Sequence, residues 1–489
     1  MSKTEKSSPF AYVIVTLSIG SFAVWRDCSL LFQTSAAIGI DGYYYVLQIN
    51  SFLNSGHFYF PTNTPLVLYL LSALACFTDN TILAVKLGIV ILQVLLYLGI
   101  ANLLQTLIKN VRFAVLGVFI TTFSILHLYF LSEFLSNLGA LVCLIWGAFG
   151  IVRLVQTKKK VWFIFAALTL LAAVFSHRSA FGLIALISFA VLYAYLWLNY
   201  AANTKRQVVF GLIILFLLAF PSVLASQAFF VLPDWLLFEL LRYPQNPFRS
   251  LILMESLMLL ILSGATLAIL FVKSEILRNS LSGLILVSIV VWSLLITLNP
   301  FLNHQTGIIG IVARLDALAY LQTAIAIPLL ISLLFSNSKK IAPGIAGLFL
   351  PLLILRLFVP LPLGLRSEYL QTREKLSSEL PVMRRQICEK PLIVAQHGEE
   401  FLATAILGLP SQQKPPVENQ YQCVFWLIHQ RKADYQIIFD KSIVSSNGDF
   451  TLVEDSEMKK DFEIMSIEER QKLISENPHL RFLFNQSTR

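Results

Sequence analysis

The stretch TILAVKLGIVILQVLLYLGIANLLQTLI, residues 81–108, decides the fold class of this chain. It runs for 28 residues and contains one charged side chain, that of Lys86. About 20 consecutive apolar residues are enough for a helix to cross the hydrocarbon core of a bilayer. Because the apolar residues are continuous and do not alternate with polar ones, the stretch predicts a transmembrane helix and excludes a membrane β-barrel.

Apolar runs of this kind recur along most of the chain. Of its 489 residues, 56% are hydrophobic and only 13% are charged, too few to cover the surface of a soluble protein. We therefore predict an all-α polytopic membrane protein with about 11 transmembrane helices. The predicted spans are 10–25, 81–108, 113–131, 134–152, 161–175, 180–198, 208–230, 251–272, 281–299, 316–336 and 341–359.

The charges of the connecting loops predict the orientation of these helices. Lysine and arginine cluster in alternate connections, and the positive-inside rule places such loops in the cytoplasm. The alternation requires that residues 65–77 lie at the outer interface without crossing and that the N-terminus is inside. One further crossing with an external N-terminus remains the alternative. The cation-rich connections are 109–112, 153–160, 203–206, 273–278 and 337–340, and they account for the net charge of +9 without a nucleic-acid site.

Composition divides the chain into two predicted domains. Residues 1–360 form the multi-spanning domain with a large first external loop at 26–80, and residues 361–489 form a small extracytoplasmic α/β domain. The first apolar run is read as a retained helix because no small-residue cleavage site follows it. Cys388 and Cys423 fall in the second domain and can pair if it is external, although the sequence does not show their separation. The predicted strands of that domain are 391–396, 423–429, 435–440 and 450–455, and its predicted helix is 398–408.

Ionisable residues gather on the side of the membrane predicted to be external. Such groups are costly at membrane depth and usually face a cavity or a substrate pathway. One polar site on the outer half explains this distribution better than separate headgroup anchors do, although each residue alone also has a purely structural explanation. The residues singled out are Asp41, His57, Lys86, His127, Glu133, His177, Arg178, Glu255, Arg314, Asp316 and Arg356.

Several motifs follow one another in a recognisable order. DGYYYVLQINSFLNSGHFYF (41–60) and PTNTPLVLYLLSAL (61–74) form an external loop with an acid soon after the first predicted helix. YFLSEFLSNLGAL (129–141), FSHRSAFGLIAL (175–186) and ARLDALAYLQTAIAIPLL (313–330) follow. In this order they resemble the GT-C superfamily of polyprenyl-phosphate-dependent glycosyltransferases, and within it family 39, which includes protein O-mannosyltransferases and the lipid A aminoarabinose transferase. TNTPL departs from the family's HPPL-type element, since its histidine and first proline are missing.

The resemblance implies the transfer of a sugar from a lipid-linked phosphate to an acceptor hydroxyl. A phosphate leaving group is already a weak base, so the reaction needs a base for the acceptor and no general acid. By resemblance Asp41 is this base, Arg314 stabilises the departing phosphate, and Glu133 orients the acceptor or holds a divalent metal such as Mg²⁺ or Mn²⁺. No set of metal ligands is assigned. The other implied substrate-binding residues are His177, Arg178, Lys86, Tyr44 and His57, of which Tyr44 can equally belong to an aromatic belt at the interface.

The implied partners are a polyprenyl-phosphate sugar donor, a glycan, lipid or protein acceptor, and the bilayer, with no nucleic acid. A multi-pass protein of a plasma membrane, most simply a bacterial inner membrane, follows from this reading. Two other functions stay open. An O-antigen polymerase or ligase would favour key cations in a large late loop, whereas the largest external loop here comes first. A lipid-linked sugar flippase or transporter would favour ionisable groups at mid-membrane and internal symmetry.

Overall fold

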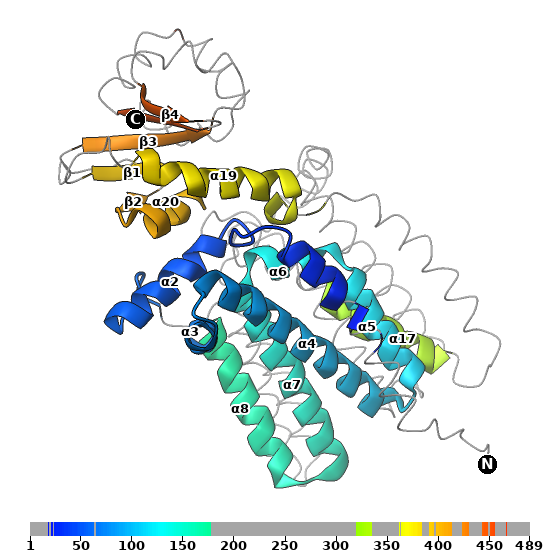
Figure 1. Cartoon of the computed structure of the whole chain (residues 1–489). Helices are drawn as coiled ribbons and strands as arrows, with labels where there is room; N and C mark the ends of the chain where they lie inside the picture. The colour runs from blue at the N-terminus through cyan, green and yellow to red at the C-terminus, as the bar shows by residue number, and fades with distance from the viewer. Residues whose placement is uncertain are drawn as a thin grey trace, which may run out of the picture. The chain divides into compact units, whose positions relative to one another are not determined.

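A computed structural model gives the structure of the chain (Figure 1). It describes residues 24–62, 65–177, 319–334, 363–383, 391–395, 398–412, 423–429, 443–447 and 450–454, with residues 18, 21, 22, 361 and 466 besides. The predicted spans between residues 178 and 318, and the span at 341–359, lie outside the described residues. The chain divides into two compact units. The first unit comprises residues 1–28, 62–67 and 89–362, and the second comprises residues 29–61, 68–88 and 363–489.

The first unit is helical wherever it is described. Helices α7 and α8 form an antiparallel hairpin that turns at Lys158, a residue with a positive φ of 55°. The two helices approach closely where Gly150 faces α8, since a Cβ there would lie 2.9 Å from the Phe165 ring. Its described helices are α4 (Thr81–Ile108, from Ile89 onward), α5 (Val111–Phe123), α6 (Ile125–Glu133), α7 (Leu135–Thr157), α8 (Lys160–Ser176) and α17 (Ala319–Leu334).

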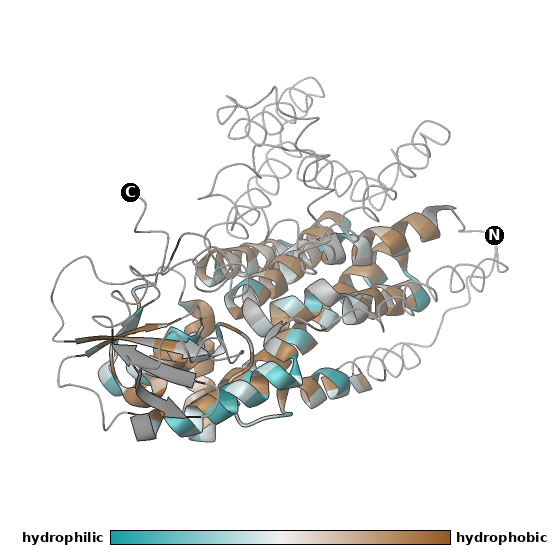
Figure 2. Cartoon of the chain, turned by 90° about the horizontal axis from the view of Figure 1, so that it is seen from above, coloured by the Kyte–Doolittle hydropathy of each residue, from teal (hydrophilic) through white to brown (hydrophobic). Residues whose placement is uncertain are grey.

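Two of the described helices have the length and composition of a membrane-spanning helix. Within the described residues, α4 and α7 are long and apolar enough to cross a bilayer, and four apolar helices of 10–17 residues accompany them. Figure 2 shows hydrophobic residues, in brown, along most of the helical chain. The bounds of α4 confirm the predicted helix 81–108. The total of about 11 crossings stays a prediction, because much of the apolar sequence lies outside the described residues.

The predicted single helix over 113–131 is wrong. The structure has two helices there, α5 and α6, which are separated at Ser124 with φ −73° and ψ 133°. The Ser124 hydroxyl caps the second helix by accepting a hydrogen bond from the His127 backbone at 3.4 Å. Thr121 and Thr122 just before it bond back to carbonyl oxygens four residues earlier, a contact that tends to bend helices. Hydrophobicity alone could not reveal this break, because the run stays apolar through it.

The second unit combines helices with a mixed five-stranded sheet in the order β2-β1-β3-β5-β4. Strand β1 pairs in parallel with β2 and β3, whereas β5 pairs antiparallel with β3 and β4. All residues of β1 are buried. The strands are β1 (Pro391–Ala395), β2 (Ser411–Gln412), β3 (Cys423–His429), β4 (Ile443–Asn447) and β5 (Phe450–Glu454). The helices are α2 (Gly42–Ser55), α3 (Leu66–Thr78, from Leu68 onward), α19 (Ser367–Met383) and α20 (Glu399–Leu407), with the short 3-10 helix η2 (Leu363–Leu365).

The described part of the tail contains both helices and strands, whereas a separate domain with the bounds 361–489 stays a prediction. Strands β1, β3 and β5 and helix α20 confirm four of the predicted elements, the short strands β2 and β4 were not predicted, and the predicted strand 435–440 lies outside the described residues. Residues 29–61 of the predicted first loop group with this tail and not with the first unit. No local sequence pattern indicates that grouping, since the two segments are more than 300 residues apart.

Helix α3 is too short to cross a bilayer on its own. Its 13 residues correspond to about 20 Å, against roughly 30 Å for a hydrocarbon core. It exposes large apolar side chains, among them Tyr69, Leu70 and Phe77, the last with 86% of its surface exposed. A short helix with exposed apolar side chains is what the prediction of an interfacial segment at 65–77 requires.

Reporter fusions at residues 110 and 448 test the predicted orientation. We expect the fusion at Asn110 to report the cytoplasm and the fusion at Gly448 to report the outside. The reason is that all cation-rich connections lie on the cytoplasmic side only if residues 65–77 do not cross the membrane. Each position is tested with one reporter that works only inside and one that works only outside. If both positions report the same side, the predicted topology is wrong.

Candidate functional site

Asp41 occupies the N-cap position of α2, at the start of the helix in the first loop. Its backbone has φ −86° and ψ 5°, and its side chain makes no capping hydrogen bond to the helix. Gly39 just before it has a positive φ of 85°, which turns the chain into α2. The helix ends at Gly56, a left-handed cap whose N–H donates to the Phe52 carbonyl at 2.8 Å. The half-buried Asp41 carboxylate therefore does not cap its own helix.

Aromatic rings surround Tyr44, which lies in the first turn of α2. Its ring stacks on Phe60 at 5.8 Å between centroids and meets the rings of Tyr45 and Phe401 edge-on, each at 5.3 Å. Burial first, and then the charge of Asp41, raise the pKa of the Tyr44 hydroxyl, while a hydrogen bond from Gln48 lowers it. The hydroxyl is therefore protonated at neutral pH, beside a carboxylate that can accept a proton.

Gln48 fixes the end of the loop against α2. Its Nε2 donates to the Phe60 carbonyl at 3.1 Å and its Oε1 accepts from the Phe60 N–H at 2.8 Å. The same Nε2 lies 3.0 Å from the Tyr44 hydroxyl. This fully buried amide thereby sets the position of both rings that stack beside Asp41.

Lys86, a predicted substrate-binding residue, holds the chain that precedes α2. Its side chain is 3% exposed, and its Nζ donates to the Thr34 carbonyl at 2.6 Å. The ammonium also lies 5.6 Å from the centre of the Phe32 ring, a cation–π distance. A role in substrate binding stays a prediction for this residue.

The structure does not bring all predicted site residues together. His57 is exposed beyond the C-terminal end of α2, whose 14 residues span about 21 Å, so it lies far from Asp41 at the other end. Glu133 ends α6 and His177 follows α8 as its C-cap, both in the first unit. Arg178 and Arg314 lie outside the described residues. Their predicted roles stay predictions.

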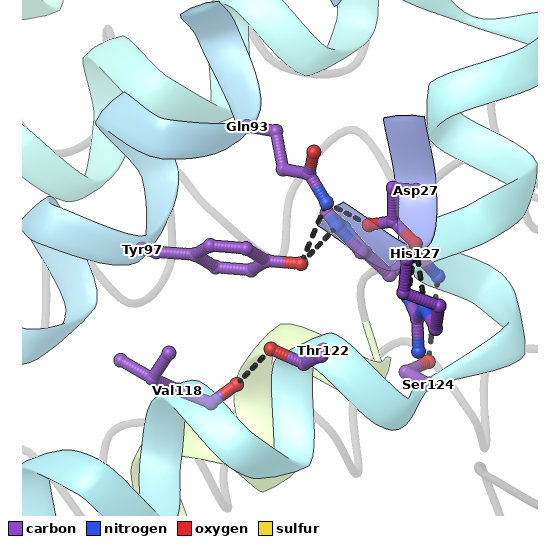
Figure 3. A network of polar contacts seen from close by, with 8 residues as sticks. Asp27, Gln93, Tyr97, Val118, Thr122, Ser124 and His127 are labelled. Atoms are coloured by element: carbon purple, nitrogen blue, oxygen red, sulfur yellow. Dashed lines mark hydrogen bonds and ion pairs between the residues drawn. The ribbon is translucent and has the colours of Figure 1, made fainter. Parts of the chain in front are cut away.

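A second polar cluster lies in the first unit (Figure 3), and of its members only His127 was singled out from the sequence. The Gln93 Nε2 donates to the Asp27 carboxylate and lies 2.9 Å from the Tyr97 hydroxyl. That hydroxyl lies in turn 2.9 Å from the His127 Nε2, and Arg26 pairs with Asp27. Asp27, Gln93, Tyr97 and His127 are each at most 2% exposed. The spacing of Gln93 and Tyr97, four residues apart in an apolar helix, is the sequence signal that could have indicated this cluster.

Replacing Gln93 by leucine tests what this polar cluster contributes. We expect Gln93→Leu to lower the free energy of unfolding by about 1–3 kcal/mol, because the buried Asp27 carboxylate loses a hydrogen-bond donor. The measurement is thermal unfolding of the purified protein in one detergent. Gln105→Leu on the same helix is the matched control, since the Gln105 Oε1 has no hydrogen-bond partner among the described residues. Equal effects of the two variants would contradict this role.

The described residues do not supply a metal site. Nowhere in the described segments do three His, Cys, Asp or Glu side chains lie together as ligands would. The divalent metal implied by the resemblance stays a prediction.

The chain was compared with protein families, curated proteins and solved structures. The chain matches no protein-family model and no curated protein. Among solved structures it is similar to ArnT from Cupriavidus metallidurans bound to undecaprenyl phosphate, with 12% identity and a TM-score of 0.48 over 91% of this chain and 98% of that chain. It is also similar to the oligosaccharyltransferase of Archaeoglobus fulgidus in the apo form, with 13% identity and a TM-score of 0.48 over 81% of this chain and 64% of that chain. TM-scores below 0.5 do not establish a shared fold, so the two polar sites stand on their own contacts.

Proposed function

We propose that this protein is a membrane glycosyltransferase of the GT-C type. It transfers a sugar from a polyprenyl-phosphate-linked donor to an acceptor hydroxyl on the outer face of the membrane. The observation that carries the proposal is the placement of Asp41. A half-buried carboxylate that does not cap its own helix stands at the start of α2, beside the rings around Tyr44. The sequence of this loop also resembles the GT-C loop in which an acid acts as base.

The proposed reaction is a single displacement at the sugar. The acceptor oxygen attacks the anomeric carbon while the bond from that carbon to the phosphate oxygen breaks. The phosphate leaves with the bonding electron pair, and the proton of the acceptor hydroxyl passes to a carboxylate oxygen of Asp41. The configuration at the anomeric carbon inverts.

Five further residues have supporting roles in this proposal, three of them by resemblance alone. The rings of Tyr44 and Phe60 offer apolar faces on which a sugar can stack. Arg314 neutralises the charge that develops on the leaving phosphate. Glu133 orients the acceptor, and His177 helps to hold the phosphate.

The proposed location of the tail is outside the membrane. Cys423, at the start of β3, is disulfide-bonded, whereas Cys28, Cys76 and Cys143 are free thiols. Disulfides persist in oxidising compartments, so a bonded Cys423 favours an extracytoplasmic tail.

Incubation of the purified protein in lipid nanodiscs with radiolabelled polyprenyl-phosphate sugars tests the proposal. We expect label to move from the lipid to an added glycan, lipid or protein acceptor, and released polyprenyl phosphate to appear in equal amount. Sealed vesicles loaded with the labelled donor separate transfer from transport. Movement of intact donor across the bilayer without loss of its sugar would show a flippase instead.

A further inference from the structure

The C-terminal segment holds the chain that leads into α2. The Gln33 Nε2 donates to the Leu365 carbonyl at 3.0 Å, and the Gly39 N–H donates to the Gly364 carbonyl at 3.2 Å. Between these contacts, the Ser35 N–H donates to the Glu374 carboxylate at 3.1 Å, and the Ser35 hydroxyl donates to the same oxygen. These hydrogen bonds hold the pKa of Glu374 below its usual value, so the carboxylate stays ionised at neutral pH.

Arg373 is the buried side chain of the tail that contacts this segment. Its side chain is 2% exposed, and its Nη1 donates to the Gly39 carbonyl at 2.6 Å. The guanidinium lies 5.1 Å from the centre of the Tyr369 ring and 5.7 Å from that of Tyr43. Among the described residues, its Nε and Nη2 have no hydrogen-bond partner. Because no described residue pairs with these two nitrogens, the hydrogen bond to Gly39 is the polar contact of the guanidinium within the described residues, which favours a role in positioning that turn.

The backbone at the start of α20 packs closely against the turn at residues 39–40. Gly398, with φ +90°, lies so close that a Cβ there would be 2.5 Å from the Ile40 carbonyl oxygen and 2.8 Å from the Arg373 Nη2. Two successive residues of the turn are thus in contact with the tail: Gly39 through its hydrogen bond from Arg373, and Ile40 through close packing against the Gly398 backbone. The next residue is Asp41.

We propose that Arg373 is a positioning residue for the reaction, acting through the Gly39 carbonyl on the placement of Asp41. The tail is then a working part of the active site, because it supplies the contacts that orient the base. This inference rests on the proposed function. A displacement of a catalytic group by about 1 Å can lower a rate by roughly 10²-fold, so the loss of one such contact has a measurable effect.

Arg373→Lys is expected to lower kcat by about tenfold and to leave the donor KM within about twofold, because the base moves while donor contacts remain. Lysine keeps the charge but cannot reproduce the planar fork of arginine. Lys375→Met is the matched control, since it removes an exposed cation two residues further along the same helix. The control is expected to retain wild-type kcat and KM.

Hydrogen exchange of the backbone amides provides a readout that is independent of activity. In Arg373→Lys we expect faster exchange in peptides that cover residues 33–42 and unchanged exchange in α4. Ser35→Ala, which changes an exposed residue and is not expected to impair folding, should loosen the same peptides to a smaller extent. Unchanged exchange in residues 33–42, or a kcat of Arg373→Lys equal to wild type, would overturn the inference. If Asp41→Asn keeps wild-type turnover, the proposed function fails instead, and the exchange result still decides whether Arg373 holds the turn.

Discussion

Asp41→Asn is expected to fold and insert like the wild type but to lose transfer by on the order of 10²–10⁴-fold. The amide resembles the carboxylate in shape, so the contacts of α2 with its neighbours should remain. It cannot accept the proton of the acceptor hydroxyl, however, and the chemical step slows while binding of the donor is preserved. Single-turnover assays with a labelled polyprenyl-phosphate sugar measure the chemical step directly.

Asp79→Asn is the matched control for this variant. Asp79 is an exposed acid of the same compact unit and has a positive φ of 51°, which asparagine also tolerates. We expect this control to retain full transfer. Wild-type turnover by Asp41→Asn would show that Asp41 is not the base and would remove the central support of the proposed function.

Arg314→Ala is expected to lower transfer by roughly 10²–10³-fold, because the charge that develops on the departing phosphate loses its fixed cation. Arg314→Lys should lose about tenfold or more, since an ammonium cannot grip two phosphate oxygens at once and one charge-assisted hydrogen bond contributes roughly 1.5–3 kcal/mol. The loss should appear in the dependence on donor concentration more than on acceptor concentration. Steady-state kinetics with both substrates varied measure this difference.

Arg112→Lys is the matched control, because Arg112 is an exposed arginine in a connection predicted to be cytoplasmic. It is expected to leave both dependences unchanged. If Arg314→Lys keeps full turnover and an unchanged donor KM, Arg314 acts only as a headgroup anchor.

Local sequence patterns predicted individual helices and strands better than they predicted which segments pack together in one compact unit. The continuous apolar run at 81–108 sets the bounds of α4, and Gly398 and Gly408 mark the two ends of α20. The break at Ser124 could not be predicted from hydrophobicity, because a serine is common inside apolar helices. A hydroxyl interrupts such a helix only when the surrounding packing favours capping over continuation.

In the candidate site, too, a local pattern indicated one residue, whereas another depends on a long-range contact. The position of Asp41 after the first helix singled it out in the sequence, and the structure places it at the start of α2 beside Tyr44. Arg373 escaped notice because it lies in an ordinary polar helix, where arginine usually faces water. Its importance depends on a contact with Gly39 across 334 positions of sequence, and no local pattern reports a contact of that range.

The pairing of residues 33–39 with residues 364–374 also sets the order of events during synthesis. The two partners of the Gln33–Leu365 hydrogen bond are 332 positions apart. At ~5–20 residues per second, a ribosome needs roughly 15–65 s to make the intervening chain. In the proposed topology, the first loop is outside during this interval but still lacks its final partner, so its partner-facing residues stay uncovered. A nonsense mutation upstream of residue 363 would leave that uncovered state permanent, with the earlier helices already inserted.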